Sequence, residues 1–215
     1  MLLYKNLEVK VLQKKVLDKG YVKLLKADKE EDILKVASIC YGKKLVDLEK
    51  KKEFLIKKLM FEHAGNPTSS FEFVNFLFEV KCPIFVARQW MRHRIGSFQE
   101  ISRRYVSDNL EFFVPEDLDE EEKTKYLEHI RLVENYYYNL INKGIRKEIA
   151  RSILPLSLYT TFYWQVNLRS LINFLKVRLD KHAQREIREY AKAIYKLIKP
   201  YAPTVCKFLK EAIKE

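Results

Sequence analysis

The sequence predicts an α+β fold that forms a single domain over residues 1–215. A chain of 215 residues with 47% hydrophobic residues is long enough to bury one large core. Most long segments carry apolar residues at three- and four-residue spacing, which is the pattern of helices. A few short segments are rich in Phe, Val, Thr and Tyr, which is typical of strands. No internal repeat or low-complexity linker divides the chain.

Turn residues and prolines mark the boundaries between the predicted elements. Residues 66–70, Asn-Pro-Thr-Ser-Ser, predict a loop, and the Phe-rich segment after it alternates as a half-buried strand does. Pro83 suits a first helical turn, and Pro155 ends a helix. The acidic stretch 115–122 suits a loop and a helix N-terminus, because acidic residues complement the helix dipole. In chain order the sequence predicts a strand at 21–26, helices at 30–40 and 45–63, a strand at 71–80, helices at 83–92, 126–143 and 146–154, a strand at 160–166, and helices at 168–179, at 182–198 and after Pro203.

Charge and hydropathy narrow the classes of partner. The chain has 41 Lys and Arg against 29 Asp and Glu, a net charge of +12. Such a basic protein can bind polyanions: nucleic acid, nucleotides or polyglutamylated cofactors. No apolar run approaches the 18 residues of a membrane span, and the first residues lack a signal-peptide pattern. We therefore expect a cytoplasmic protein with no membrane partner.

The sequence also lacks the usual metal and phosphate motifs. Its three cysteines lie far apart, and its four histidines form no His-Glu-x-x-His pair. We therefore expect neither a metal site nor a disulfide framework. With five glycines, the chain has no glycine-rich phosphate loop. Any phosphate group must be held mostly by side chains.

The segment 88–104 carries the most chemical information. It holds five arginines and one histidine in seventeen residues, interleaved with apolar residues such as Trp90 and Phe98. So much apolar surface places the guanidinium groups at the rim of a core, where a phosphate can pair with them bidentately. Ser102 adds a hydroxyl donor. Glu100 can orient an arginine or accept hydrogen bonds from a ribose hydroxyl.

The residues alone leave other interpretations of this segment open. It can form a structural Arg–Glu network or a patch for nucleic-acid phosphates. Its position at a helix end that runs into a loop favours a small, defined anion. The rival function is a nucleotide- or RNA-binding module without redox chemistry, which would bind anions with a steep salt dependence and ignore flavin.

An arginine completes an apolar row on the helix predicted at 168–179. The row is Leu171, Phe174, Leu175 and Arg178, which share one helical face. Such an arginine either reaches solvent or pairs with a buried group, and the sequence leaves both open. Asn167 stands at the expected N-cap, and Arg169 and Asn173 share another face.

These motifs resemble those of the flavin-dependent thymidylate synthases. Arg92-His93-Arg94, seven further residues, then Ser102 and Arg104-Tyr105 match the signature of that family. The preceding segment 83–91 is similar to the helix that leads into the signature. The likeness continues through segments 146–155, 158–160 and 164–173 and covers roughly residues 60–185.

The resemblance implies a fold, an activity and an assembly. The fold is a small, mostly antiparallel sheet packed against several long helices, as in thymidylate synthase-complementing proteins. The activity is reductive methylation of dUMP to dTMP, with 5,10-methylenetetrahydrofolate as carbon donor, NADPH as reductant and FAD as cofactor. The assembly is a cytoplasmic homotetramer with active sites shared between subunits and no nucleic-acid partner.

The resemblance also implies roles for individual residues. Arg178 is the expected catalytic residue, which contacts the uracil ring and favours its ionised form. The residues expected to bind dUMP are Gln89, Arg92, Glu100, Ile101, Ser102, Arg103, Arg104, Arg151 and Arg178. Arg151 and Arg178 are expected to reach this site from another chain. The residues expected to bind FAD are Ser69, Arg92, His93, Arg94, Glu100, Asn167, Leu168, Arg169 and Asn173.

The chain departs from the family pattern at a few positions. Family members often have a histidine in the loop that here spans 66–70. Phe73 stands where a second histidine is usual, although Glu72 before it is kept. Arg103 occupies a position that is often small, and Gln99 one that is often Asn. The loop difference leaves one flavin or folate contact in question.

Overall fold

A computed structural model describes residues 12–42, 50–61 and 65–214. The first turns and the last residues of the helix predicted at 45–63 lie outside the described residues. The remainder of that prediction is confirmed by α3 (Lys52–Phe61).

The sheet has five strands in the order β1-β2-β3-β5-β4, and every neighbouring pair is antiparallel. The strands are β1 (Leu12–Val16), β2 (Gly20–Ala27), β3 (Asn75–Pro83), β4 (Ser97–Glu100) and β5 (Tyr159–Asn167). β3 and β5 pair along their whole length, from Asn75 opposite Asn167 to Pro83 opposite Tyr159. Because β3 and β5 are antiparallel, the end of β3 lies beside the start of β5. The pairing of β4 with β5, with Ser97 opposite Gln165, brings the arginine-rich segment back next to the helix that follows β5.

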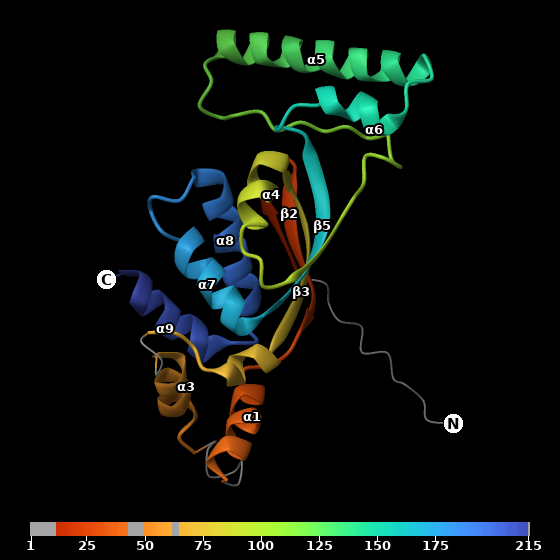
Figure 1. Cartoon of the computed structure of the whole chain (residues 1–215). Helices are drawn as coiled ribbons and strands as arrows, with labels where there is room; N and C mark the ends of the chain where they lie inside the picture. Colours follow the sequence, from red (N-terminus) through yellow and green to blue (C-terminus); the bar gives the residue numbers. More distant parts are fainter. Residues whose placement is uncertain (1–11, 43–49, 62–64, 215) are drawn as a thin grey trace.

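The helices α4 (Ile84–Trp90), α7 (Leu168–Arg178) and α8 (Arg185–Ile198) pack on one face of the sheet. The helices α1 (Glu31–Tyr41), α3 and α9 (Pro203–Lys214) pack together near one end of the sheet, the lower end in the view (Figure 1). The long helix α5 (Glu120–Asn142) and the short α6 (Lys147–Ala150) lie apart from these, beyond one end of β5 (Figure 1). The predicted α+β class, an antiparallel sheet packed against helices, is therefore confirmed.

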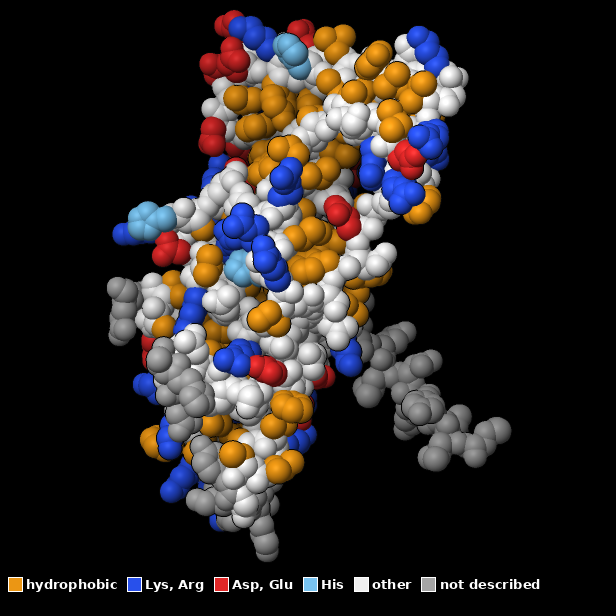
Figure 2. Space-filling model, viewed as in Figure 1, with side chains coloured by type: hydrophobic (Ala, Val, Ile, Leu, Met, Phe, Trp, Pro, Cys, Tyr) orange, Lys and Arg blue, Asp and Glu red, His pale blue; other side chains and the backbone are white. Residues whose placement is uncertain are grey.

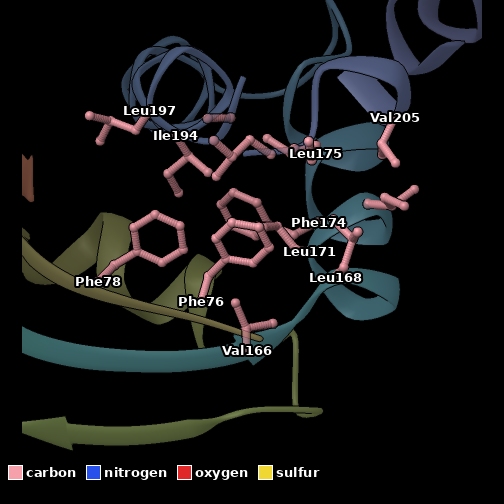
Figure 3. Packing of buried hydrophobic residues seen from close by; sticks show 14 of the residues in the cluster. Phe76, Phe78, Val166, Leu168, Leu171, Phe174, Leu175, Ile194, Leu197 and Val205 are labelled. Carbon is pink, nitrogen blue, oxygen red and sulfur yellow. The ribbon is translucent and has the colours of Figure 1, made fainter. Parts of the chain in front are cut away.

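Alternation along the strands builds the core. Phe76 and Phe78 of β3 and Val166 of β5 point from the sheet toward α7 and α8 (Figure 3). They meet the buried row of α7, which includes Phe174 (Figure 3). Trp90, at the end of α4, packs its ring edge-on against Trp164, with the centroids 5.3 Å apart. The last turn of α4, where the arginine-rich segment begins, is thus anchored in the core.

Three helix predictions need correction at their ends. The helix predicted from 126 begins at Glu120, because Asp119 caps it by accepting a hydrogen bond from the Glu122 N–H at 2.8 Å. The acidic stretch is therefore a loop and a helix start, as predicted. The helix predicted at 146–154 is only α6 followed by a 3₁₀ turn, η2 (Arg151–Ile153). The helix predicted from 182 begins at 185.

The strand predictions were wrong in two places. Residues 71–74 are not strand: Ser69–Phe73 form a 3₁₀ turn, η1, and β3 starts at Asn75. Two short strands, β1 and β4, were not predicted. β4 has four residues, and because it is an edge strand only Phe98 is shielded enough to leave an apolar signal.

Candidate flavin and nucleotide site

A cavity of about 700 Å³ opens between the end of α4, the start of α7 and the loop before η1. This volume lies within the range typical of cofactor sites. Six of the residues expected to bind FAD line it: Arg92, His93, Arg94, Asn167, Arg169 and Asn173. Arg94 and Asn167, the nearest members of the two halves of this set, lie 73 positions apart in the sequence, and the pairing of Ser97 with Gln165 brings the two halves together.

The loop after α4 is pressed closely against β5. At Gly96 a side-chain Cβ would lie 2.9 Å from the Gln165 carbonyl oxygen and 2.9 Å from the Trp164 Nε1 atom. Glycine is therefore required here for steric reasons. This close approach holds Arg92 and Arg94 at the mouth of the cavity, where both are exposed.

The cavity has an excess of positive charge. Neither Arg92 nor Arg94 forms an ion pair with a described residue. Arg169 pairs with Glu72, and the Lys176 ammonium donates to the Gly65 carbonyl at 2.9 Å. Exposed guanidinium groups without carboxylate partners are well suited to a phosphate or pyrophosphate.

The N-terminus of α7 forms one wall of the cavity. The Asn167 side chain caps the helix by accepting a hydrogen bond from the Ser170 N–H at 2.9 Å, which confirms the predicted cap. Arg169 and Asn173, one turn apart, both face the cavity. Leu168 is wholly buried, so its side chain belongs to the core and does not line the cavity.

Arg178 is held by two acceptors of its own chain. Its Nε–H donates to His93 Nε2 at 3.0 Å, and its Nη2 donates to the Gln89 carbonyl oxygen at 2.8 Å. Of the two open alternatives, Arg178 therefore pairs with half-buried groups of its own chain. Its expected contribution to the dUMP site of another chain stays a prediction.

His93 separates Arg178 from the cavity. Its ring meets Phe174 edge-on, with the centroids 5.0 Å apart. Burial and the neighbouring positive charge of Arg178 lower the pKa of His93 to about 4. The imidazole is therefore neutral at physiological pH, and its Nε2 atom is free to accept the hydrogen bond from Arg178.

The second half of the arginine segment lies toward α6. Glu100, at the end of β4, accepts a hydrogen bond from the Thr160 hydroxyl at 2.6 Å. Arg104 lies 3.6 Å from Glu148 of α6, and the Lys147 ammonium donates to the Tyr105 carbonyl at 3.1 Å. Arg103 turns back to the Asp108 carbonyl at 2.8 Å.

The expected site residues therefore fall into two groups. The α4–α7 cluster contains Gln89, Arg92, His93, Arg94, Asn167, Arg169, Asn173 and Arg178. The β4–α6 cluster contains Glu100, Ile101, Ser102, Arg103, Arg104 and Arg151. Among the described residues, no hydrogen bond or ion pair joins the two clusters. Ser69, exposed at the start of η1, belongs to neither and does not line the cavity.

Sequence reasoning missed several residues that line the cavity. They include Asn66, Glu72, Trp164 and Lys176. The helical spacing of Lys176 from Arg169 and Asn173 places it on the same face of α7, so the sequence could have predicted that it lines the cavity. The family pattern singled out Glu72 as a kept residue, but its place beside the cavity depends on η1, which was not predicted.

The described residues contain neither a metal-binding cluster nor a helix able to cross a membrane. In the described part of the chain, no group of three or more His, Cys, Asp or Glu side chains has the geometry to hold a metal ion. None of the helices within those same ranges has both the length and the apolar character needed to cross a bilayer.

Comparisons with known proteins match nearly the whole chain. A family model described as thymidylate synthase complementing protein matches residues 23–204. The flavin-dependent thymidylate synthase of Thermotoga neapolitana is 43% identical over 210 residues, covering 93% of this chain and 95% of the relative. That of Thermosipho africanus is 42% identical over 224 residues, covering 94% and 96%.

The fold is also similar to that of a solved enzyme. The crystal structure of a UMP/dUMP methylase, PolB, from Streptomyces cacaoi, bound with 5-Br dUMP, matches with a TM-score of 0.80. The two sequences are 26% identical, and the match covers 90% of this chain and 96% of that one.

Proposed function

Because the chain belongs to the flavin-dependent thymidylate synthase family, we propose that it methylates dUMP to dTMP with FAD bound in the cavity beside α7. In this proposal 5,10-methylenetetrahydrofolate supplies the carbon and NADPH supplies the reducing equivalents. The observation that carries the proposal is that six residues expected to contact FAD converge on one positively charged cavity.

The residues that line the cavity fit FAD in charge. Arg92, Arg94 and Arg169 offer the cations that a pyrophosphate requires. Ile95, which is exposed, adds apolar surface beside them. FAD supplies hydride-level redox chemistry when bound, so the chain needs no cysteine nucleophile. Its own residues bind, orient and shield the reactants.

Arg178 is proposed to act on the uracil ring. His93 Nε2 and the Gln89 carbonyl occupy two of its donors, which fixes the plane of the guanidinium. Its remaining N–H groups can then donate to the pyrimidine, where negative charge develops as the ring is activated. A positioned cation lowers the energy of such charge without having to reorganise.

The two clusters are proposed to meet between subunits of a homotetramer. Within one cluster Arg178 donates a hydrogen bond to the Gln89 carbonyl, and within the other Arg104 lies next to Glu148 of α6. Hydrophobic side chains gather on α5 and near α6, and Lys and Arg side chains gather below them in the view (Figure 2). The exposed apolar residues include Leu132, Tyr136, Ile145, Ile149 and Leu156. An apolar surface of this kind is typical of a protein interface.

The phosphate of dUMP is assigned to the β4–α6 cluster. Ser102 and Arg104 are proposed to lie nearest the phosphate, and Arg151 of another chain is proposed to complete this site. Arg151 is exposed and forms no ion pair with any residue that the structure describes. Ser69 and the backbone of Leu168 are proposed to complete the FAD contacts. We place the enzyme in the cytoplasm, with small-molecule substrates and no nucleic-acid partner.

A visible absorbance spectrum tests the proposal. The purified protein is incubated with FAD, desalted and titrated with dUMP, with UMP as the matched control nucleotide. We expect retained oxidised-flavin bands that shift on addition of dUMP, because both ligands share one site. A colourless protein whose binding of dUMP is weak and steeply salt-dependent would instead support the phosphate-binding module.

A further inference from the structure

The buried hydroxyl group of Thr160 contacts the Glu100 carboxylate. Thr160 belongs to β5, the strand between β3 and β4, and only 5% of its surface is exposed. Its Oγ1 atom donates to Glu100 Oε1 at 2.6 Å. A hydrogen bond to a charged acceptor in a shielded position is stronger than one between neutral groups.

The backbone of Glu100 is fixed as well. Glu100 pairs with Phe162 across the β4–β5 ladder, and the next residue, Ile101, donates its N–H to the Thr161 carbonyl at 2.9 Å. The Glu100 side chain remains exposed, and no described residue other than Thr160 donates to it. One carboxylate oxygen is therefore held by the protein, while the other is available to a ligand.

The residues that lie beneath the Glu100 carboxylate are buried and shielded from water. Cys82 of β3 pairs with Thr160 and is wholly buried. Burial, followed by the nearby charge of Glu100, raises the pKa of the Cys82 thiol well above its usual range. Water cannot readily replace the Thr160 hydroxyl in such a place, so losing the hydroxyl leaves the carboxylate without that partner.

We propose that Thr160 is a positioning residue, which holds one oxygen of Glu100 so that the other faces the bound nucleotide. The inference rests on the proposed function, which assigns Glu100 to dUMP and flavin. Glutamate has several rotatable bonds, so ordering the Glu100 side chain only when the nucleotide binds would cost conformational entropy. The hydrogen bond from Thr160 orders this side chain beforehand and so reduces that cost.

The test compares matched variants of the flavin-loaded protein. Thr160→Val removes the hydroxyl and keeps the branched shape, whereas Thr160→Ser keeps the hydroxyl. Thr161→Val makes the same change at the next residue, whose side chain lies on the opposite face of β5. Glu100→Gln and the Thr160→Val/Glu100→Gln double variant complete a cycle. The measurements are dUMP affinity from the flavin spectrum, kcat and KM, and the melting temperature.

We expect Thr160→Val to weaken dUMP binding about tenfold while the protein retains FAD, because a charged hydrogen bond is lost. Thr160→Ser and Thr161→Val should both bind dUMP within about twofold of the parent. In the double variant, Thr160→Val should add nothing to the effect of Glu100→Gln, because its effect passes through the carboxylate.

Four results would overturn the inference. Unchanged dUMP affinity and kcat in Thr160→Val, together with a loss in Glu100→Gln, would refute only the role of Thr160. Additive effects in the double variant, or an equal loss in Thr160→Ser, would show a merely structural role. If Glu100→Gln binds dUMP as the parent does, the assignment of Glu100 fails and the role of Thr160 fails with it. A parent protein that binds neither FAD nor dUMP would refute the proposed function itself.

Discussion

At the scale of single residues, the site depends on how the Arg178 guanidinium is oriented. It donates hydrogen bonds to His93 and to the Gln89 carbonyl, which lie 85 and 89 positions earlier in the chain. Arg178 does not itself line the cavity, whereas His93 does. In the proposed function, flavin binding and activation of the pyrimidine therefore depend on different side chains, His93 and Arg178, which contact one another.

Arg178→Ala separates these two functions. We expect turnover to fall by two to three orders of magnitude, on the order of the loss of one pre-organised donor to developing charge. FAD should stay bound, because the cavity lining is intact. Absorbance after desalting and dTMP formation measure the two properties. Arg188→Ala, which removes an arginine bound to the Lys181 carbonyl, is the matched control and should keep both. Loss of the flavin together with activity would indicate a structural role.

His93 predicts a defined pH dependence of stability. Its pKa is about 4 in the folded protein, below the ordinary value of 6.5, so the unfolded state binds more protons between these values. The free energy of unfolding should therefore fall as pH drops from 6.5 toward 4 and change no further from this group below 4. His93→Gln, which keeps an acceptor for Arg178, should flatten this dependence. Equal pH slopes of melting temperature in parent and variant would contradict the assignment.

Several of these residues could be predicted from the sequence, and others could not. Helical spacing was enough to place Arg178 on the buried face of α7 and Asn167 at its cap, because both are local properties. The partner of Arg178 was not predictable in this way. Its contact with His93 depends on the β4–β5 register and on the close approach of Gly96 to β5, which no local pattern encodes.

At the scale of elements, a buried carboxylate joins three helices. Glu30, just before α1, is wholly buried. It accepts hydrogen bonds from the N–H groups of Thr204 and Val205, at 2.9 and 3.2 Å, at the start of α9. It also lies 3.0 Å from the Lys52 ammonium of α3. A negative charge at a helix N-terminus is favourable, and its burial makes the arrangement costly to disrupt.

Glu30→Gln should therefore destabilise the protein. We expect a loss of about 3 kcal/mol in the free energy of unfolding, because Lys52 loses its buried partner and α9 loses the charge at its N-terminus. Denaturant unfolding of the flavin-loaded protein measures it. Glu53→Gln, which breaks the exposed pair with Lys207, is the control and should cost less than about 1 kcal/mol. Equal losses in the two variants would refute the role of Glu30.

The sequence predicted long helices better than short elements. The row of α7 and the acidic start of α5 were visible because each repeats over several turns. The 3₁₀ turn η1 was read as strand because its apolar residues run directly into β3, although Phe73 is 62% exposed. β4 was missed because four residues on an edge carry too few buried positions to make a pattern.

At the scale of the whole molecule, the separation of the two clusters is the main feature. The β4–α6 cluster lies near an exposed apolar surface on α5 and α6, and the α4–α7 cluster surrounds the cavity (Figures 1 and 2). Family motifs allowed the residues of both clusters to be predicted from the sequence. Their division into two groups was not predicted, because it follows from tertiary contacts such as that of Arg104 with Glu148.

Mixing two inactive variants tests whether sites are shared. We expect Arg104→Ala and Arg178→Ala each to be nearly inactive. After subunit exchange at equal amounts, about one quarter of sites should combine an intact Arg104 from one chain with an intact Arg178 from another. Activity should recover to about that fraction, measured as dTMP formation. A mixture of Arg178→Ala with Arg178→Lys should not recover. If the first mixture does not recover activity although subunit exchange is verified, both arginines of a site come from the same chain.

The formation of dTMP tests the central claim most directly. Flavin-loaded protein is supplied with dUMP, 5,10-methylenetetrahydrofolate and NADPH, and the nucleotides are separated and quantified. We predict that dTMP forms in proportion to the NADPH consumed and that omitting dUMP, folate or FAD abolishes its formation. Consumption of NADPH without dTMP, or dTMP formation that persists in flavin-free protein, would contradict the claim.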